Sequence, residues 1–184
     1  LMDRNQVVFL QETRGTAGDL AGLPASHAHF GSFLYPDEHV GSSRAGGVVT
    51  SIQLSIIDRV DSISEQFLAA GRCHGLRLVG RDFDLLCINV HLCPQWSFMQ
   101  KRGLLLAIDK LTRKHPDAIL LLGGDWNFIH NDDRRLDTGS ATEIAGSDPI
   151  ATFFEKQFGD LVELAQPNYT RANSLLAPAA ALQT

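Results

Sequence analysis

The hydrophobic pattern along this chain predicts short strands separated by glycine, proline and polar residues. Four consecutive aliphatic residues at 119–122 are typical of a strand buried on both faces, and two glycines end it. Other apolar or β-branched runs predict strands at residues 7–10, 48–52, 56–57, 76–79 and 83–92. The last two of these strands are separated by Gly80-Arg81-Asp82, which indicates a hairpin.

Helical spacing occurs in two places. Within residues 95–115, Leu104 and the apolar residues three, four and seven positions later predict an amphipathic helix that ends before Pro116. Asp148 and Pro149 have the chemistry of a helix N-cap and first helical position. Residues 131–146 predict a polar loop, and residues 1–5 the end of a helix. The alternation of strand, helix and strand predicts an α/β arrangement with outer helices.

Length and composition narrow this picture. The 184 residues fit one domain with a substantial core. No apolar run reaches the length of a membrane span. The first residues lack a basic segment followed by an apolar one, so secretion is not expected. Three cysteines without paired spacing favour a reducing, intracellular compartment, and we interpret Cys87 and Cys93 as small buried apolar side chains. The net charge of −5 counts against a dedicated DNA-binding domain but not against a nuclease, because metal-ligand carboxylates contribute to it.

Two carboxylates lie where predicted strands end. Asp125 and the amide of Asn127 follow the strand at 119–122, and Glu12 follows the strand at 7–10. Asp is a good turn former, so a turn cap is the simpler interpretation of Asp125, and an exposed strand exit is the simpler interpretation of Glu12. The alternative is chemistry: ligands bind at the carboxyl ends of strands in open α/β sheets, and hard cations such as Mg²⁺ prefer oxygen ligands.

A histidine lies at the end of the 83–92 strand. Strand alternation places Cys87, Asn89 and His91 on one face, and the aliphatic residues between them on the other. A histidine in such a position is usually a satisfied structural residue. Asn89 is expected to hold loops by hydrogen bonds.

Four segments together resemble one family. They are Val8-Phe9-Leu10-Gln11-Glu12-Thr13-Arg14, Ala45-Gly46-Gly47-Val48-Val49-Thr50, Leu86-Cys87-Ile88-Asn89-Val90-His91-Leu92 and Gly124-Asp125-Trp126-Asn127. Their order and spacing resemble the endonuclease/exonuclease/phosphatase superfamily of metal-dependent phosphodiesterases. Gly124-Asp125-Trp126-Asn127-Phe128 and residues 166–171 are most similar to endonuclease domains of non-LTR retroelements.

The resemblance implies a deoxyribonuclease-like fold of the α/β (α+β) type. Two mixed β-sheets would pack face to face between outer helices, giving a four-layer sandwich. The similar region is residues 1–171, and the Ala- and Leu-rich residues 172–184 lie outside it. The family's first strand with its Asn, and its last strands with an Asp-His pair, have no counterpart in these residues. The fold is therefore expected to be incomplete.

The resemblance also implies a reaction. Glu12 would bind Mg²⁺, or Mn²⁺, and Asp125 would orient or deprotonate the attacking water. Asn127 would hold the phosphate and Asp125 by hydrogen bonds, and His91 would assist at the scissile phosphate. The similarity to retroelements favours nicking of DNA in the nucleus, and no membrane or protein partner is indicated.

Two alternatives stay open at this point. One is a catalytically incomplete remnant or non-catalytic module of the same fold, and the other is a hydrolase of a phosphoester other than nucleic acid. Because the family's terminal motifs are missing, the 184-residue chain alone is expected to be weakly active or inactive and only marginally folded.

Overall fold

The computed structural model describes residues 6–34, 46–128, 134–137, 142–145 and 148–162. The chain divides into two compact units, Leu1–Phe128 and Ile129–Thr184, and each is described by itself. The helix end expected at residues 1–5, the retroelement-like residues 166–171 and the tail at 172–184 lie outside the described residues. Within the described residues, no helix is both long and apolar enough to cross a membrane.

The first unit contains two β-sheets. The smaller sheet is antiparallel throughout, with β3 between β1 and β2. The larger sheet has the order β4-β5-β6-β7, in which β7 runs parallel to β6 and the other pairs are antiparallel. The strands are β1 (Val7–Gln11), β2 (His27–Ser32), β3 (Val48–Gln53), β4 (Val60–Ala69), β5 (Cys73–Gly80), β6 (Asp84–His91) and β7 (Ile119–Asp125). The predicted hairpin between β5 and β6 is confirmed.

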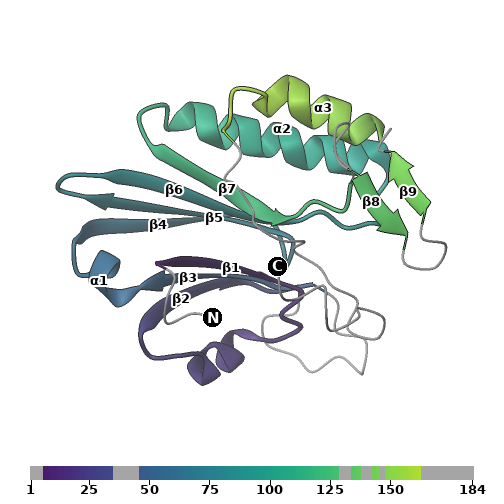
Figure 1. Ribbon diagram of the computed structural model, residues 1–184. Coiled ribbons are helices and arrows are strands. Elements are labelled where there is room, and N and C mark those ends of the chain that lie inside the picture. The colour runs from purple at the N-terminus through teal and green to yellow at the C-terminus, as the bar shows by residue number, and fades with distance from the viewer. Residues whose placement is uncertain (1–5, 35–45, 129–133, 138–141, 146–147, 163–184) are drawn as a thin grey trace. The chain divides into compact units, whose positions relative to one another are not determined.

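The two sheets stack face to face, with the main core between them (Figure 1). Ile52 of the smaller sheet packs with Leu76, Leu78 and Cys87 of the larger one, all of them fully buried. Contact between the sheets is close at Gly123, where an added Cβ would lie 2.9 Å from the Phe9 ring. The predicted pair of packed sheets and the α+β class are confirmed.

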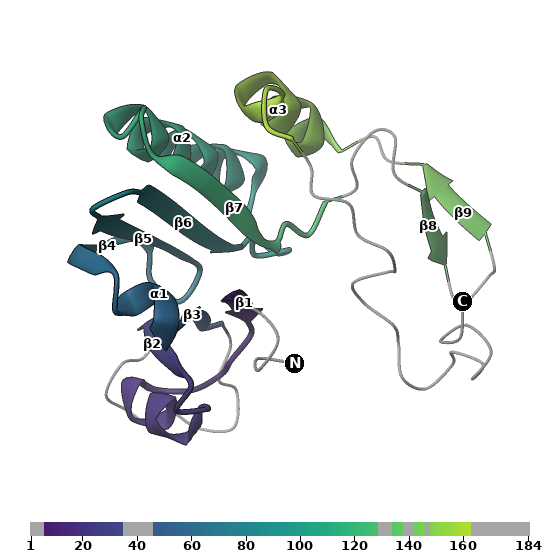
Figure 2. The same ribbon diagram turned by 60° about the vertical axis from the view of Figure 1, so that its left-hand side comes forward.

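Helix α2 (Phe98–Lys114) covers the outer face of the larger sheet (Figure 2). Ser97 caps it in a reciprocal capping box with Gln100, so the helix begins three residues later than the predicted segment. Its apolar stripe faces the sheet, and Leu111 lies so near the β5 backbone that a Cβ on Gly75 would come within 2.8 Å of it. Beside β2, the described residues also form a short 3₁₀ helix, η2 (Ala17–Gly22).

Strand alternation in β6 directs Asn89 and His91 toward the smaller sheet. Asn89 is fully buried and links three strands across the interface between the sheets. Its Nδ2 donates to the carbonyls of Leu10 (3.2 Å) and Val49 (2.9 Å), and its Oδ1 accepts from Gln11 Nε2 at 2.7 Å. The expected holding role of Asn89 is confirmed, although it joins strands and not loops.

Several expectations about individual elements were wrong. Residues 56–57 belong to a helical turn, α1 (Leu54–Ile57), and not to a strand. Strand β4 was not predicted, because half of its ten side chains are polar, without regular alternation, and most of them are exposed. Strand β7 is half-buried, not buried on both faces, since it is the last strand in the described order of its sheet. The sheets were both expected to be mixed, and the smaller one is purely antiparallel.

The second unit contains one hairpin and one helix among its described residues. Strands β8 (Arg134–Asp137) and β9 (Thr142–Ala145) pair antiparallel where a polar loop was expected. Helix α3 (Pro149–Phe158) begins as predicted, because the Asp148 side chain accepts from Ile150 N at 2.9 Å and Pro149 occupies the first helical position.

A fully buried histidine lies on the inner face of the larger sheet. His74 Nε2 lies 2.9 Å from Glu65 Oε2, the Phe67 ring stacks on the imidazole, and its Nδ1 has no hydrogen-bond partner. Burial lowers the pKa of His74, because it removes the imidazolium from water, and the charge and hydrogen bond of Glu65 only partly offset this.

Folding stability should therefore depend on pH through His74. Because its pKa is lower in the folded state, its full contribution is present above the unfolded value of about 6.5. This contribution should be lost as the pH falls from there toward the folded pKa, because the unfolded chain binds the proton first. Urea unfolding at a series of pH values should show a shallower loss of stability for His74→Gln than for the parent. Parallel curves would contradict the prediction.

Candidate active site

The backbone at the end of β1 is held in an unusual conformation. Glu12 and Arg14 both have left-handed φ angles, 54° and 51°. Thr13 N donates to the Gly47 carbonyl at 3.2 Å and Arg14 N donates to the Gly46 carbonyl at 2.9 Å, so the adjoining segment holds this turn from one side. Gly47 leaves the necessary room, since a Cβ there would lie 2.4 Å from Thr13 Oγ1. The position of Glu12 is thus fixed by its surroundings.

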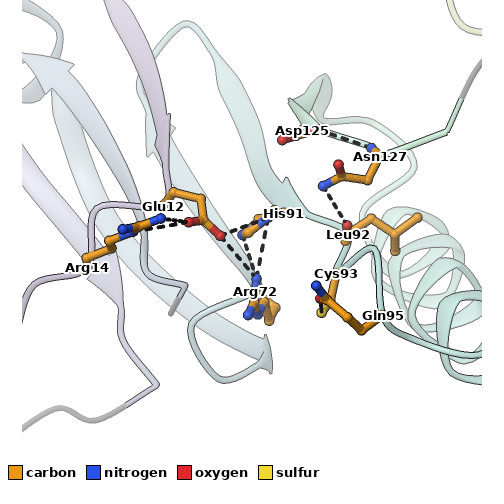
Figure 3. Close-up of polar contacts among 9 residues, drawn as sticks. All are labelled: Glu12, Arg14, Arg72, His91, Leu92, Cys93, Gln95, Asp125 and Asn127. Carbon is orange, nitrogen blue, oxygen red and sulfur yellow. Dashed lines mark hydrogen bonds and ion pairs between the residues drawn. The ribbon is translucent and has the colours of Figure 1, made fainter. Parts of the chain in front are cut away.

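The Glu12 carboxylate lies among positively charged and polar nitrogen atoms. Its side chain is 38% exposed, and its Oε2 accepts from Arg14 Nη2 at 3.1 Å. Its Oε1 lies 3.3 Å from His91 Nε2 and 3.7 Å from Arg72 Nη1 (Figure 3). The two carboxylate oxygens therefore have different partners, the exposed Arg14 for Oε2 and the buried His91 and Arg72 for Oε1.

His91 is almost completely covered, with 2% of its surface exposed. Arg72 Nη1 lies 2.7 Å from its Nδ1 and 3.4 Å from its Nε2. Burial and the charge of Arg72 lower the pKa of His91, and the charges of Glu12 and Asp125 act in the opposite direction without reversing the shift. The ring is therefore neutral in this environment at neutral pH, and both carboxylates lie near enough to influence it.

Asp125 lies beside His91, because the two residues are register partners in the parallel β6–β7 pair. Its backbone carbonyl accepts from Leu92 N at 2.8 Å. Its Oδ1 accepts from Asn127 N at 3.1 Å, and Asn127 Nδ2 donates to the Leu92 carbonyl at 2.9 Å. The Asn127 backbone, with φ 48°, is left-handed, a conformation that Asn tolerates better than most residues. The bond that holds Asp125 thus comes from the Asn127 backbone and not from its side chain.

The structure brings the four predicted residues to one end of the facing sheets. Glu12 contacts His91 directly, Asp125 is its neighbour in the sheet, and Asn127 is tied to Leu92 next to it. His91 is more buried than a residue expected to contact a phosphate.

Sequence reasoning missed Arg72. Nothing local signals its role, because an arginine after a glycine in a turn is normally exposed. Arg14 was part of the resemblance, but no role was assigned to it.

The oxygen atoms of this cluster fit a hard cation. Among the described residues, no three His, Cys, Asp or Glu side chains gather closely enough to enclose a metal. Mg²⁺ does not need such a cage, since it commonly uses one or two carboxylates together with water and substrate phosphate. Glu12 supplies such a carboxylate, 38% exposed, and a bound cation would have to compete there with the guanidinium groups of Arg14 and Arg72.

The fold is a sandwich of two packed sheets. Carboxylate, imidazole and amide groups meet at one end of its strands and form a candidate hydrolytic site. The chain belongs to the endonuclease/exonuclease/phosphatase family, whose profile matches residues 1–177. Comparison with curated proteins gave no match.

Solved structures share this fold at low sequence identity. The endonuclease domain of TRAS1, a telomere-specific non-LTR retrotransposon, is 12% identical with a TM-score of 0.53, over 86% of this chain and 59% of that one. A conserved protein of unknown function from Enterococcus faecalis V583 is 12% identical with a TM-score of 0.54, over 84% and 59%. TDP2 of D. rerio, solved with a single-stranded DNA product, is 21% identical with a TM-score of 0.47, over 68% and 49%. The chain spans about half the length of these structures.

Proposed function

We propose that this protein hydrolyses phosphodiester bonds with the help of Mg²⁺, and that its substrate is DNA, which it nicks. The observation that carries the proposal is the meeting of Glu12, His91 and Asp125 at neighbouring strand ends in a chain of this family. The fold is shared with a retrotransposon endonuclease domain, which favours DNA and a nuclear location. Mn²⁺ is the other cation that this oxygen-rich site suits.

Each residue has a defined task in this proposal. Glu12 holds the cation, and the chemistry that Mg²⁺ supplies in such a site is polarisation of a phosphoryl oxygen and relief of charge on the leaving oxygen. Asp125 orients the attacking water and takes its proton. Asn127 fixes Asp125 through its backbone N–H, and its side-chain amide retains one N–H for a phosphate oxygen. Because its ring is covered, His91 acts through its contact with Glu12.

The proposal is tested by nicking of supercoiled plasmid. The protein, with any sequence that flanks residues 1–184 in nature, should relax the plasmid in Mg²⁺ and stop on chelation. Glu12→Gln should lower the rate on the order of 10²-fold, because a neutral amide would hold the cation poorly and a misplacement of about 1 Å already costs that much. Glu65→Gln, a matched change beside His74, should not. Metal-independent nicking, or a Glu12→Gln rate equal to the parent's, would exclude this mechanism.

A non-catalytic module is the second candidate. It is favoured by the pairing of both Glu12 oxygens with protein nitrogen atoms, which leaves neither of them free in this arrangement. A folded protein that neither nicks DNA nor hydrolyses a small phosphodiester such as bis(p-nitrophenyl) phosphate would establish it. Hydrolysis of the small ester without nicking would assign the site to a substrate other than DNA.

A further inference from the structure

Arg72 is a nearly buried cation inside the site, and it has no role in the reaction proposed above. Its side chain is 11% exposed, so it has little surface to offer a substrate. Arg14, which pairs with the same carboxylate, is 66% exposed. The two arginines beside Glu12 thus differ in their surroundings: Arg72 is held inside the protein, and Arg14 is bound to Glu12 at the surface.

The turn that carries Arg72 is anchored to both sheets. The Gly71 carbonyl accepts from Gly47 N at 2.9 Å, and Gly71 N donates to Ser32 Oγ at 3.0 Å. The Arg72 carbonyl accepts from His91 N at 2.7 Å. Gly71 has φ 61°, and a Cβ on it would lie 2.6 Å from Leu34 N, so this turn fits tightly. These backbone contacts therefore fix the position from which the Arg72 side chain reaches His91 and Glu12.

We propose that Arg72 is a positioning residue that fixes the His91 ring with Nδ1 as acceptor and Nε2–H directed at Glu12. A guanidinium can only donate hydrogen bonds. The shorter contact, 2.7 Å from Arg72 Nη1 to His91 Nδ1, therefore requires a lone pair on Nδ1. The ring hydrogen must then lie on Nε2, which is 3.3 Å from Glu12 Oε1.

One cation in this way orients two site residues. Its Nη1 also lies 3.7 Å from Glu12 Oε1, so Arg72, His91 and Glu12 form a closed triangle of contacts. Without Arg72 the ring could turn over and exchange its two nitrogen atoms, and Glu12 would lose its buried cationic partner. The catalytic consequence rests on the proposed function, whereas the state of the His91 ring does not.

The state of the ring is measured by ¹⁵N–¹H NMR of the imidazole groups in metal-free protein, with His91 assigned from the spectrum of His91→Gln. At neutral pH, Nδ1 of His91 should have the chemical shift of an unprotonated acceptor and Nε2 that of a protonated nitrogen. A protonated Nδ1 in the parent would overturn the proposal. Arg72→Ala should alter the His91 signals, and an unchanged spectrum would also overturn it. Should Arg72→Ala not fold, the parent spectrum alone decides.

Steady-state nicking in Mg²⁺ gives the second readout. Arg72→Ala should lower kcat about 10–100-fold with little change in KM, as is usual when the partner of a metal-site residue is removed. Arg72→Lys keeps the charge without the fork of donors, and it should fall nearly as far. Full activity in Arg72→Lys would show that charge, and not placement, is what matters.

The matched control is Arg77→Ala, in strand β5, which begins directly after Arg72. Arg77 pairs with Asp84 on the opposite face of the larger sheet, so its removal should change neither the His91 spectrum nor kcat. A parent protein with the expected His91 spectrum but no nicking would reject the proposed function and leave the positioning role of Arg72 intact.

Discussion

Asp125→Asn is expected to lower the nicking rate by about 10²- to 10⁴-fold, the usual contribution of a positioned general base. The fold should survive. Asn keeps a side-chain carbonyl that can accept the hydrogen bond from Asn127 N, and the bond from Leu92 N goes to the backbone. The Tm should therefore change little, whereas the nicking rate should fall by the stated factor. The measurement pairs plasmid nicking in Mg²⁺ with a melting curve on the same sample.

The control for this change is Asp148→Asn at the start of α3. Asp and Asn are nearly equivalent as helix caps, so neither the rate nor the stability should change. If Asp125→Asn loses folding and activity together, Asp125 is a turn cap, which was the simpler interpretation of its sequence context.

Among substitutions of a described glycine by alanine, Gly124→Ala is expected to reduce the free energy of unfolding most. Gly124 has φ 141°, a conformation open essentially to glycine alone, and its added Cβ would lie 1.9 Å from the Val90 carbonyl oxygen. The β6–β7 pair would have to separate where it places His91 and Asp125 side by side. We expect a loss of about 3 kcal/mol or more in the free energy of unfolding. A drop of roughly 6–12 °C in Tm corresponds to the lower figure.

Gly103→Ala is the matched control for this substitution. Gly103 lies on the exposed side of α2 with no atom within 4 Å of an added Cβ. Alanine is the better helix former by about 1 kcal/mol, so this variant should be more stable than the parent. A Gly124→Ala protein with the parent's Tm would show that the end of β7 does not need the close approach to Val90.

Local patterns determined much of the fold. Alternation of side chains in a strand is enough to place Asn89 and His91 on one face of β6, and the structure has them so. The chemistry of a helix start is local as well, which is why Asp148 and Pro149 begin α3 where the sequence indicated. The two-sheet class followed from four short motifs in order, because each contains one terminus of a strand in the fold that the family shares.

Other features were decided only by tertiary structure. Strand β4 is built from residues with little apolar periodicity, and its hydrogen bonds to β5 hold it in the sheet. The extent of burial of β7 depends on how many strands lie beside it, which no local run of aliphatic residues can indicate.

The side-chain pairing in the polar cluster around Glu12 also could not be predicted from local sequence. Arg72 can be buried because other parts of the chain supply a carboxylate that offsets its charge and an imidazole that accepts its hydrogen bond. The nearer of these two residues, His91, is 19 positions away. The Asn127 side chain turns to Leu92, 35 residues before it, and leaves its backbone to hold Asp125. The sequence determined which groups reach this end of the sheets. Which group pairs with which was settled by the packing of the two sheets, since burying a charge or a hydrogen-bond donor is tolerated only where a partner from another strand meets it.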